Sequence, residues 1–113
     1  MPVPSRRLKE EVDGTVDHHA ARLGRWPALA EVDFRWRGSF GYITAIMEID
    51  GHDEHIPLCR IRYLGEPEEW GFELLSAAND AYEPALLHTG GFTGHPNDAF
   101  DTAALVHLAD YEA

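Results

Sequence analysis

Cysteine and lysine are nearly absent from this sequence of 113 residues, in which Cys59 and Lys9 are each the single example. One cysteine excludes an intrachain disulfide and a thiolate cluster for zinc or for an iron–sulfur centre. No apolar run approaches the roughly 18 residues of a membrane span, and Met1 to Glu11 lacks a signal-peptide pattern. We therefore expect no membrane segment and a cytoplasmic location.

Basic residues are missing from the second part of the chain. Residues 1–62 carry a net charge of −1, whereas residues 63–113 contain ten acidic residues and no lysine or arginine, for a net charge of −10. Such a surface repels phosphate backbones, because affinity for nucleic acid comes largely from lysine and arginine side chains that displace counterions. The charge disfavours nucleic-acid binding and favours either solubility or a basic partner.

The spacing of residues predicts the fold of a single domain over residues 1–113. Ser5 can cap a helix over 6–23, where apolar residues recur every three to four positions, and Gly24 would end it. Period-two patterns separated by short turns predict four strands, at 31–37, 40–50, 55–64 and 70–77. Pro96 opens a final helix. We expect an α+β fold of order α-β-β-β-β-α, a four-stranded antiparallel meander with the two terminal helices packed on one face.

Residues 79–95 are expected to form a loop between the fourth strand and the last helix. A loop of about 17 residues inside a compact domain is usually functional or mobile. Four of its side chains suit polar binding or proton transfer: Tyr82, Glu83, His88 and His95. The loop and its histidines therefore predict a small enzyme or a ligand-binding protein as an alternative function.

Alternating residues of the first and third strands place several arginines on the outer sheet face. This face would carry Arg35, Arg37, Tyr42, Arg60 and Arg62. Paired with acidic neighbours, the arginines would form ordinary cross-strand ion pairs. Left unpaired, they would form a small anion-binding surface, and both readings stay open. The same face, or an exposed edge strand, could support a homodimer.

One segment of this region nearly matches the RNA-stacking signature of RRM domains. It reads Arg37-Gly38-Ser39-Phe40-Gly41-Tyr42-Ile43, with Phe40 and Tyr42 spaced to put two rings on one sheet face. Ser39 is an insertion, and the turn leaves no room for the helix that RRM domains have between their first two strands. The charge and this mismatch favour a hairpin whose aromatic residues pack across strands.

The histidines suggest a metal site only weakly. His52-Asp53-Glu54-His55 offers two imidazoles and two carboxylates in one turn, but a metal ion would need further ligands such as His88 or His95. The spacing matches no metal-binding pattern, so we expect no metal and no other cofactor. Cys59 shares a strand face with apolar residues, which predicts a buried, unreactive thiol.

A resemblance covers residues 26–110. Leu58-Cys59-Arg60-Ile61-Arg62-Tyr63 and the following Trp70-Gly71-Phe72 resemble segments of a group of small uncharacterised bacterial proteins. Arg35 to Tyr42, Asp80-Ala81-Tyr82-Glu83 and the helix start at Gly94 to Pro96 extend the likeness. The group has no established activity, so the resemblance implies a shared fold and assigns no catalytic residue.

The leading functional hypothesis follows from the charge and from the lack of a coherent catalytic set in the sequence. It is a non-catalytic protein-interaction or regulatory module that presents its acidic C-terminal half to a basic protein partner.

Overall fold

The first element is helix α1, Arg6–Leu23, in a computed structural model that describes residues 2–111. The Ser5 side chain accepts a hydrogen bond from the backbone N–H of Leu8, and Gly24 ends the helix with a left-handed φ of 61°. Val12, Val16 and Ala20 form its buried stripe. The predicted helix over 6–23 is thus confirmed, together with both of its end signals.

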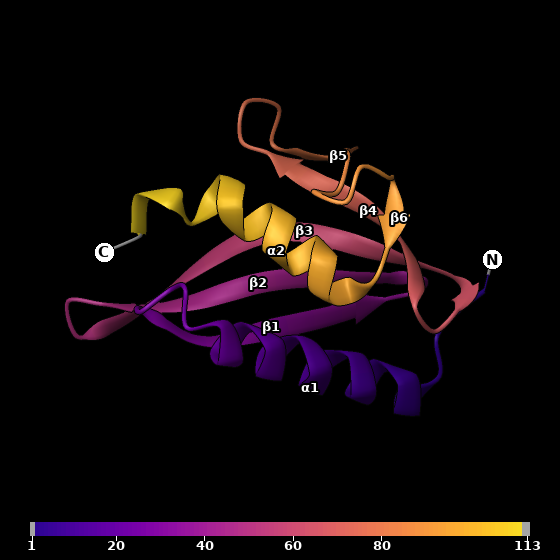
Figure 1. Ribbon diagram of the computed structural model, residues 1–113, viewed down its shortest axis with the longest axis horizontal. Helices are drawn as coiled ribbons and strands as arrows, with labels where there is room; N and C mark the ends of the chain where they lie inside the picture. Colours follow the sequence, from indigo (N-terminus) through magenta and orange to yellow (C-terminus); the bar gives the residue numbers. More distant parts are fainter. Residues whose placement is uncertain (1, 112–113) are drawn as a thin grey trace.

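Four long strands follow, as Figure 1 shows. They are β1 (Leu29–Arg37), β2 (Phe40–Ile49), β3 (His52–Glu66) and β4 (Glu69–Ser76). All neighbours are antiparallel, in the order β1-β2-β3-β4 of the expected meander. Asp50 and Gly51 both have positive φ, which is the conformation that a two-residue turn between twisted strands requires.

The sheet is larger than the four strands expected. Within the expected loop 79–95, Ala81–Pro84 forms β5 and pairs with the second half of β4, while Thr93–Gly94 forms the short β6 and pairs with its first half. The prediction of one continuous loop over 79–95 is therefore wrong, because two short strands interrupt it. The α+β class and the antiparallel sheet are confirmed.

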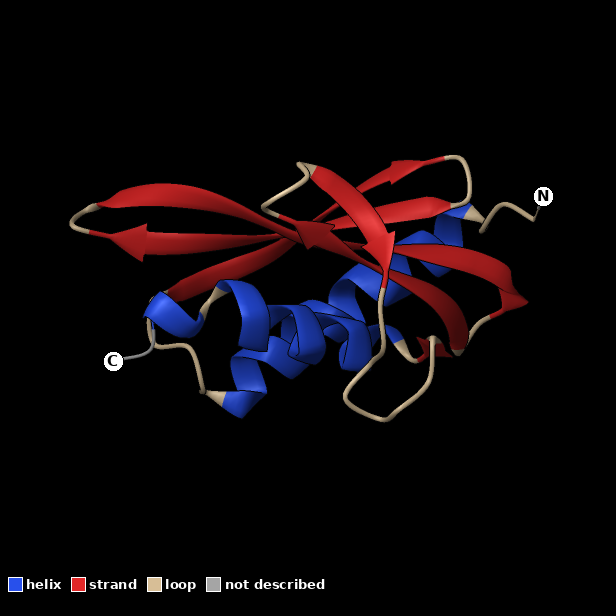
Figure 2. Cartoon of the chain, turned by 90° about the horizontal axis from the view of Figure 1, so that it is seen from above, coloured by secondary structure: helices blue, strands red, loops and turns tan. Residues whose placement is uncertain are grey.

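The chain then forms α2, Pro96–His107, and a short 3-10 turn, Ala109–Tyr111. Both helices lie on the same side of the sheet, as Figure 2 shows. Helix α1 packs on β1, α2 packs on β3 and β4, and the two helices contact each other. The core between these layers includes Val16, Ile43, Leu58, Trp70 and Phe100, all with at most 1% exposure. This arrangement leaves the other sheet face uncovered by either helix.

None of the helices in the described part of the chain is both long and apolar enough to cross a membrane.

Candidate functional site

The uncovered sheet face carries all four arginines that the sequence placed there. In the strand register, Arg35 lies opposite Tyr42, Tyr42 opposite Arg60, and Arg60 opposite Glu73. The neighbouring row pairs Arg37 with Phe40 and Phe40 with Arg62. Directly opposite residues point to the same side of a sheet, so both rows lie on this face. We call it the outer face.

Arg60 is the centre of a polar and aromatic cluster on the outer face. Its Nε and one terminal nitrogen donate to Oε1 of Glu73, at 2.9 and 2.7 Å, and its other terminal nitrogen donates to the Tyr42 hydroxyl at 3.0 Å. Its guanidinium carbon lies 4.1 Å from the ring centre of Phe40 and 5.3 Å from that of Tyr82. Three rings and one carboxylate thus hold this guanidinium in place.

The surroundings of Arg60 and Tyr82 keep the guanidinium charged and the phenol hydroxyl protonated. Burial opposes the charge of Arg60, but the hydrogen bonds to Glu73 and Tyr42 outweigh it and raise the pKa of the guanidinium. For Tyr82 the charged form is the deprotonated one, so burial raises its pKa. At neutral pH the face therefore presents a fixed cation and a protonated Tyr82 hydroxyl.

Beside this cluster the outer face is hollowed. An open depression of about 600 Å³ is lined by Arg35 and Arg37 of β1, by Tyr42, by His55 and by Tyr82, among others. The Arg35 side chain is 85% exposed and lies 4.0 Å from a carboxylate oxygen of Asp33. Among the described residues Arg37 makes no ion pair, and it too is exposed. The hollow therefore combines aromatic rings with one arginine, Arg37, that makes no ion pair within the described residues, and a second, Arg35, that is paired with Asp33.

The four loop candidates do not form one site. Tyr82 joins the outer face, where its ring meets that of Tyr42 edge-on at 5.3 Å. Glu83 accepts hydrogen bonds from the side chain of Asn79. His95 caps α2, since its Nδ1 accepts from the backbone N–H of Asn97. Tyr82 thus belongs to the outer face together with the arginines, whereas Glu83 and His95 make hydrogen bonds within their own segments.

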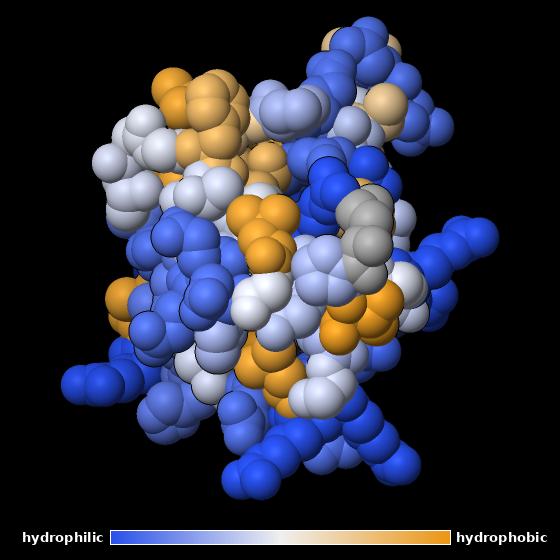
Figure 3. Space-filling view, turned by 90° about the vertical axis from the view of Figure 1, so that its right-hand side faces the viewer, coloured by the Kyte–Doolittle hydropathy of each residue, from blue (hydrophilic) through white to orange (hydrophobic). Residues whose placement is uncertain are grey.

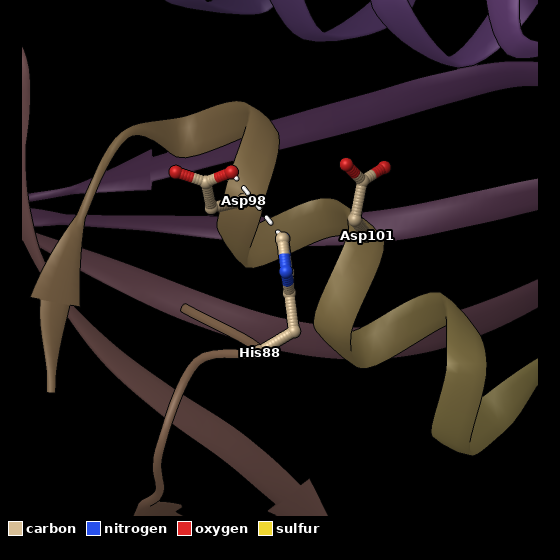
Figure 4. A group of neighbouring side chains, drawn as sticks. All are labelled: His88, Asp98 and Asp101. Carbon is tan, nitrogen blue, oxygen red and sulfur yellow. Dashed lines mark ion pairs between the residues drawn. The ribbon is translucent and has the colours of Figure 1, made fainter. Parts of the chain in front are cut away.

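His88 lies in a separate cluster on the helix layer. Figure 4 shows His88, from the segment before α2, pointing toward Asp98 and Asp101, which project from successive turns of α2. His88 Nε2 is 3.3 Å from Oδ1 of Asp98. One ligand atom from each of the three residues lies within 4.8 Å of the others, as a metal ion would require. His19 of α1 contacts this cluster, because its Nε2 lies 2.9 Å from both carboxylate oxygens of Asp101.

Within the residues that the structure describes, the acidic residues of the C-terminal half are not gathered on one surface. Glu73 is bound to Arg60, and Asp98 and Asp101 face histidines. Three exposed carboxylates remain together in the turn between β3 and β4, those of Glu66, Glu68 and Glu69. Figure 3 looks at the end of the molecule that bears this turn and shows a largely hydrophilic surface with separate apolar patches.

Sequence reasoning missed Glu73, Asp98, Asp101 and His19 as members of these sites. Alternation along strand β4 is the signal that could have found Glu73 on the outer face, but its register against Arg60 depends on the turn at Glu66 to Glu69. Asp98 and Asp101 stand at i and i+3, which puts two carboxylates on one helix face. His88 lies against the same helix face only because of tertiary packing, which the sequence pattern does not reveal.

Comparison of the chain with models of protein families, with curated proteins and with solved structures gave no match. Geometry and charge therefore carry the functional conclusion.

Proposed function

We propose that this protein is a non-catalytic binding module that takes a small organic anion, carrying a planar ring, in the hollow of its outer face. The observation that carries the proposal is the Arg60 cluster beside exposed Arg37. A guanidinium fixed by Glu73, Tyr42 and two further rings holds Tyr42 and Tyr82 in place at the edge of the hollow. Arg37, which lines the hollow, adds a cation without a partner among the described residues. Preorganised rings and arginines favour planar anions because little side-chain entropy is lost on binding.

The size of the hollow supports a small ligand. Pockets for small molecules typically enclose about 300–1,000 Å³, and this depression measures about 600 Å³. The whole chain has a net charge of −11, which repels long polyanions more strongly than a ligand with one or two charges. A small anion can therefore bind the local arginines while meeting less repulsion from the net charge than a long polyanion does.

Equilibrium binding of phenyl phosphate, measured by calorimetry, tests the proposal. We expect binding that benzylamine, which has the same ring and a positive charge, does not show. Arg37→Gln should weaken the affinity about tenfold, the effect of one charge-assisted hydrogen bond. Arg22→Gln is the matched control, because it removes the same charge from an exposed position on α1. Equal effects of the two variants would contradict an outer-face site.

The basic-partner hypothesis is the second candidate, and one observation favours it. Glu66, Glu68 and Glu69 are exposed in one turn, and Glu11 of α1 lines the same depression as Glu68. These carboxylates could bind a basic peptide. An octalysine peptide should then bind at low salt and lose most of its affinity when Glu66 and Glu68 are replaced by glutamine. Unchanged affinity in that double variant would rule the turn out.

The cytoplasmic location, the homodimer and the membership of the small bacterial protein group stay predictions from the sequence.

A further inference from the structure

We propose a second site, on the helix layer, in which His88, Asp98 and Asp101 bind a Zn²⁺ ion. It is separate from the outer face, because α2 lies on the opposite side of the sheet (Figure 2). The three residues come from two segments of the chain that only the fold brings together. One imidazole and two carboxylates are ligands that suit Zn²⁺ better than Mg²⁺ or Ca²⁺, which prefer oxygen ligands alone.

The distance between His88 and Asp98 fits a zinc ion, and Asp101 is near enough to complete the site. With bonds of about 2.0 Å to nitrogen and oxygen, a tetrahedral zinc ion holds its ligand atoms about 3.3 Å apart. His88 Nε2 and Asp98 Oδ1 are 3.3 Å apart. Asp101 lies within 4.8 Å of both, so a shift of its carboxylate oxygen by about 1.5 Å would bring it to the tetrahedral separation. In Figure 4 the His88 side chain reaches toward Asp98, and the Asp98 and Asp101 carboxylates project from the same side of α2.

His88 is held in position by its backbone. Its N–H donates to Oγ1 of Thr102, which in turn donates to the backbone carbonyl of Asp98. The preceding residue, Leu87, is 3% exposed and its N–H donates to the carbonyl of Gly91. The segment that bears His88 is therefore anchored to α2 on one side and to the core on the other.

His19 acts as a positioning residue for the site. Its imidazole lies 2.9 Å from both oxygens of Asp101, and both side chains are about one-quarter exposed, at 26% and 25%. An imidazole N–H that donates to a ligating carboxylate fixes the orientation of that carboxylate. Three protein ligands leave at least one coordination position for water.

An ordinary structural role explains only part of this arrangement. Asp98 stands in the first turn of α2, where a carboxylate stabilises the helix without a metal ion. That role does not require His88 or Asp101. Two carboxylates also offset the positive end of the helix, which would otherwise repel a cation. The net charge of −11 further favours cation binding.

Titration calorimetry of the untagged protein with Zn²⁺ tests the site. We expect one Zn²⁺ per chain, and a Co²⁺ complex with the visible absorption bands of low coordination number. His88→Gln should weaken Zn²⁺ binding at least tenfold, the usual order of effect for lost ligands and their supports. The His88 side chain is 44% exposed, so this variant should keep the fold. His19→Gln should weaken binding less, while preserving the Co²⁺ spectrum.

Two control variants locate the ion. His18→Gln removes an exposed histidine next to His19, and His52→Gln removes one at the β2–β3 hairpin. Neither should change the affinity or the stoichiometry. The proposal is overturned if His88→Gln binds Zn²⁺ as the parent protein does, if His52→Gln abolishes binding, or if the parent protein binds no Zn²⁺. Circular dichroism of each variant without metal separates a lost ligand from a lost fold.

Discussion

At the scale of single residues, Arg60 is the side chain on which the outer face depends. Its side chain is only 24% exposed and that of Glu73 only 21%, so this ion pair is shielded from solvent more than a surface pair. Removing one partner of such a pair leaves the other desolvated and without its hydrogen bonds. We therefore expect Arg60 to stabilise the fold, and its contacts hold Tyr42 and Tyr82, which line the hollow.

Arg60→Met should lower the free energy of unfolding by about 1–3 kcal/mol, because it leaves Glu73 without its donor. Arg35→Gln is the control on the same face. Arg35 is 85% exposed, so its loss should change stability by no more than about 0.5 kcal/mol. Urea denaturation of both variants measures the difference, and equal midpoints would show that the Arg60 cluster does not stabilise the protein.

At the scale of elements, the α1–β1 contact protects an edge of the sheet. β1 is the first strand in the sheet order. Oδ1 of Asp17 in α1 accepts a hydrogen bond from the backbone N–H of Val32 in β1, at 2.9 Å. A side chain of α1 thus satisfies a donor that an edge strand would otherwise expose.

Asp17→Ala should cost about 1 kcal/mol of stability, the typical contribution of one such hydrogen bond. Asp17→Asn keeps an acceptor oxygen and should cost clearly less. Thermal unfolding by circular dichroism compares the two, and native-state hydrogen exchange at Val32 should be faster in the alanine variant alone. Identical exchange rates in both variants would argue against the capping role.

Some of the helices, strands and contacts could be predicted from the sequence and others could not. The helix over 6–23 was predictable because Ser5, Gly24 and the apolar spacing are local signals. β5 was not, because Ala81–Pro84 is four residues long, ends in proline and gains its backbone partners only from β4. His88 was a candidate from the sequence, but its partners depend on the distant packing of Leu87. Long-range contacts of this kind leave no local pattern.

At the scale of the whole molecule, we expect the excess negative charge to work against the fold. Asp13 is one place where it contributes: burial, and after it repulsion from Asp33, Asp17 and Glu31, raises the pKa of Asp13 above its ordinary value near 3.8. A carboxyl with a higher pKa in the folded chain holds its proton more tightly there. Stability therefore falls as the pH rises from the pKa of the unfolded chain through that of the folded chain. Asp13 is therefore destabilising at neutral pH and not at low pH.

Asp13→Asn should raise the urea midpoint at pH 7 and leave it nearly unchanged at about pH 3, where Asp13 is protonated in both states. The part of the gain that comes from repulsion should shrink as salt is added, since about 1 M salt screens charges beyond roughly 3 Å, while the part that comes from burial should persist. Asp53→Asn, which removes an exposed charge in the β2–β3 hairpin, is the control and should give a smaller gain. An equal gain in both variants would point to net charge alone.

The central claim is that the outer face binds a small anion, and a map of amide shifts in the ¹⁵N-labelled protein titrated with phenyl phosphate tests it most directly. We predict that the largest shifts cluster in β1, β2 and β5, around Arg37, Tyr42 and Tyr82, and that benzylamine does not reproduce them. Shifts that cluster on α1 and α2 instead, or that phenyl phosphate and benzylamine produce alike, would contradict the claim.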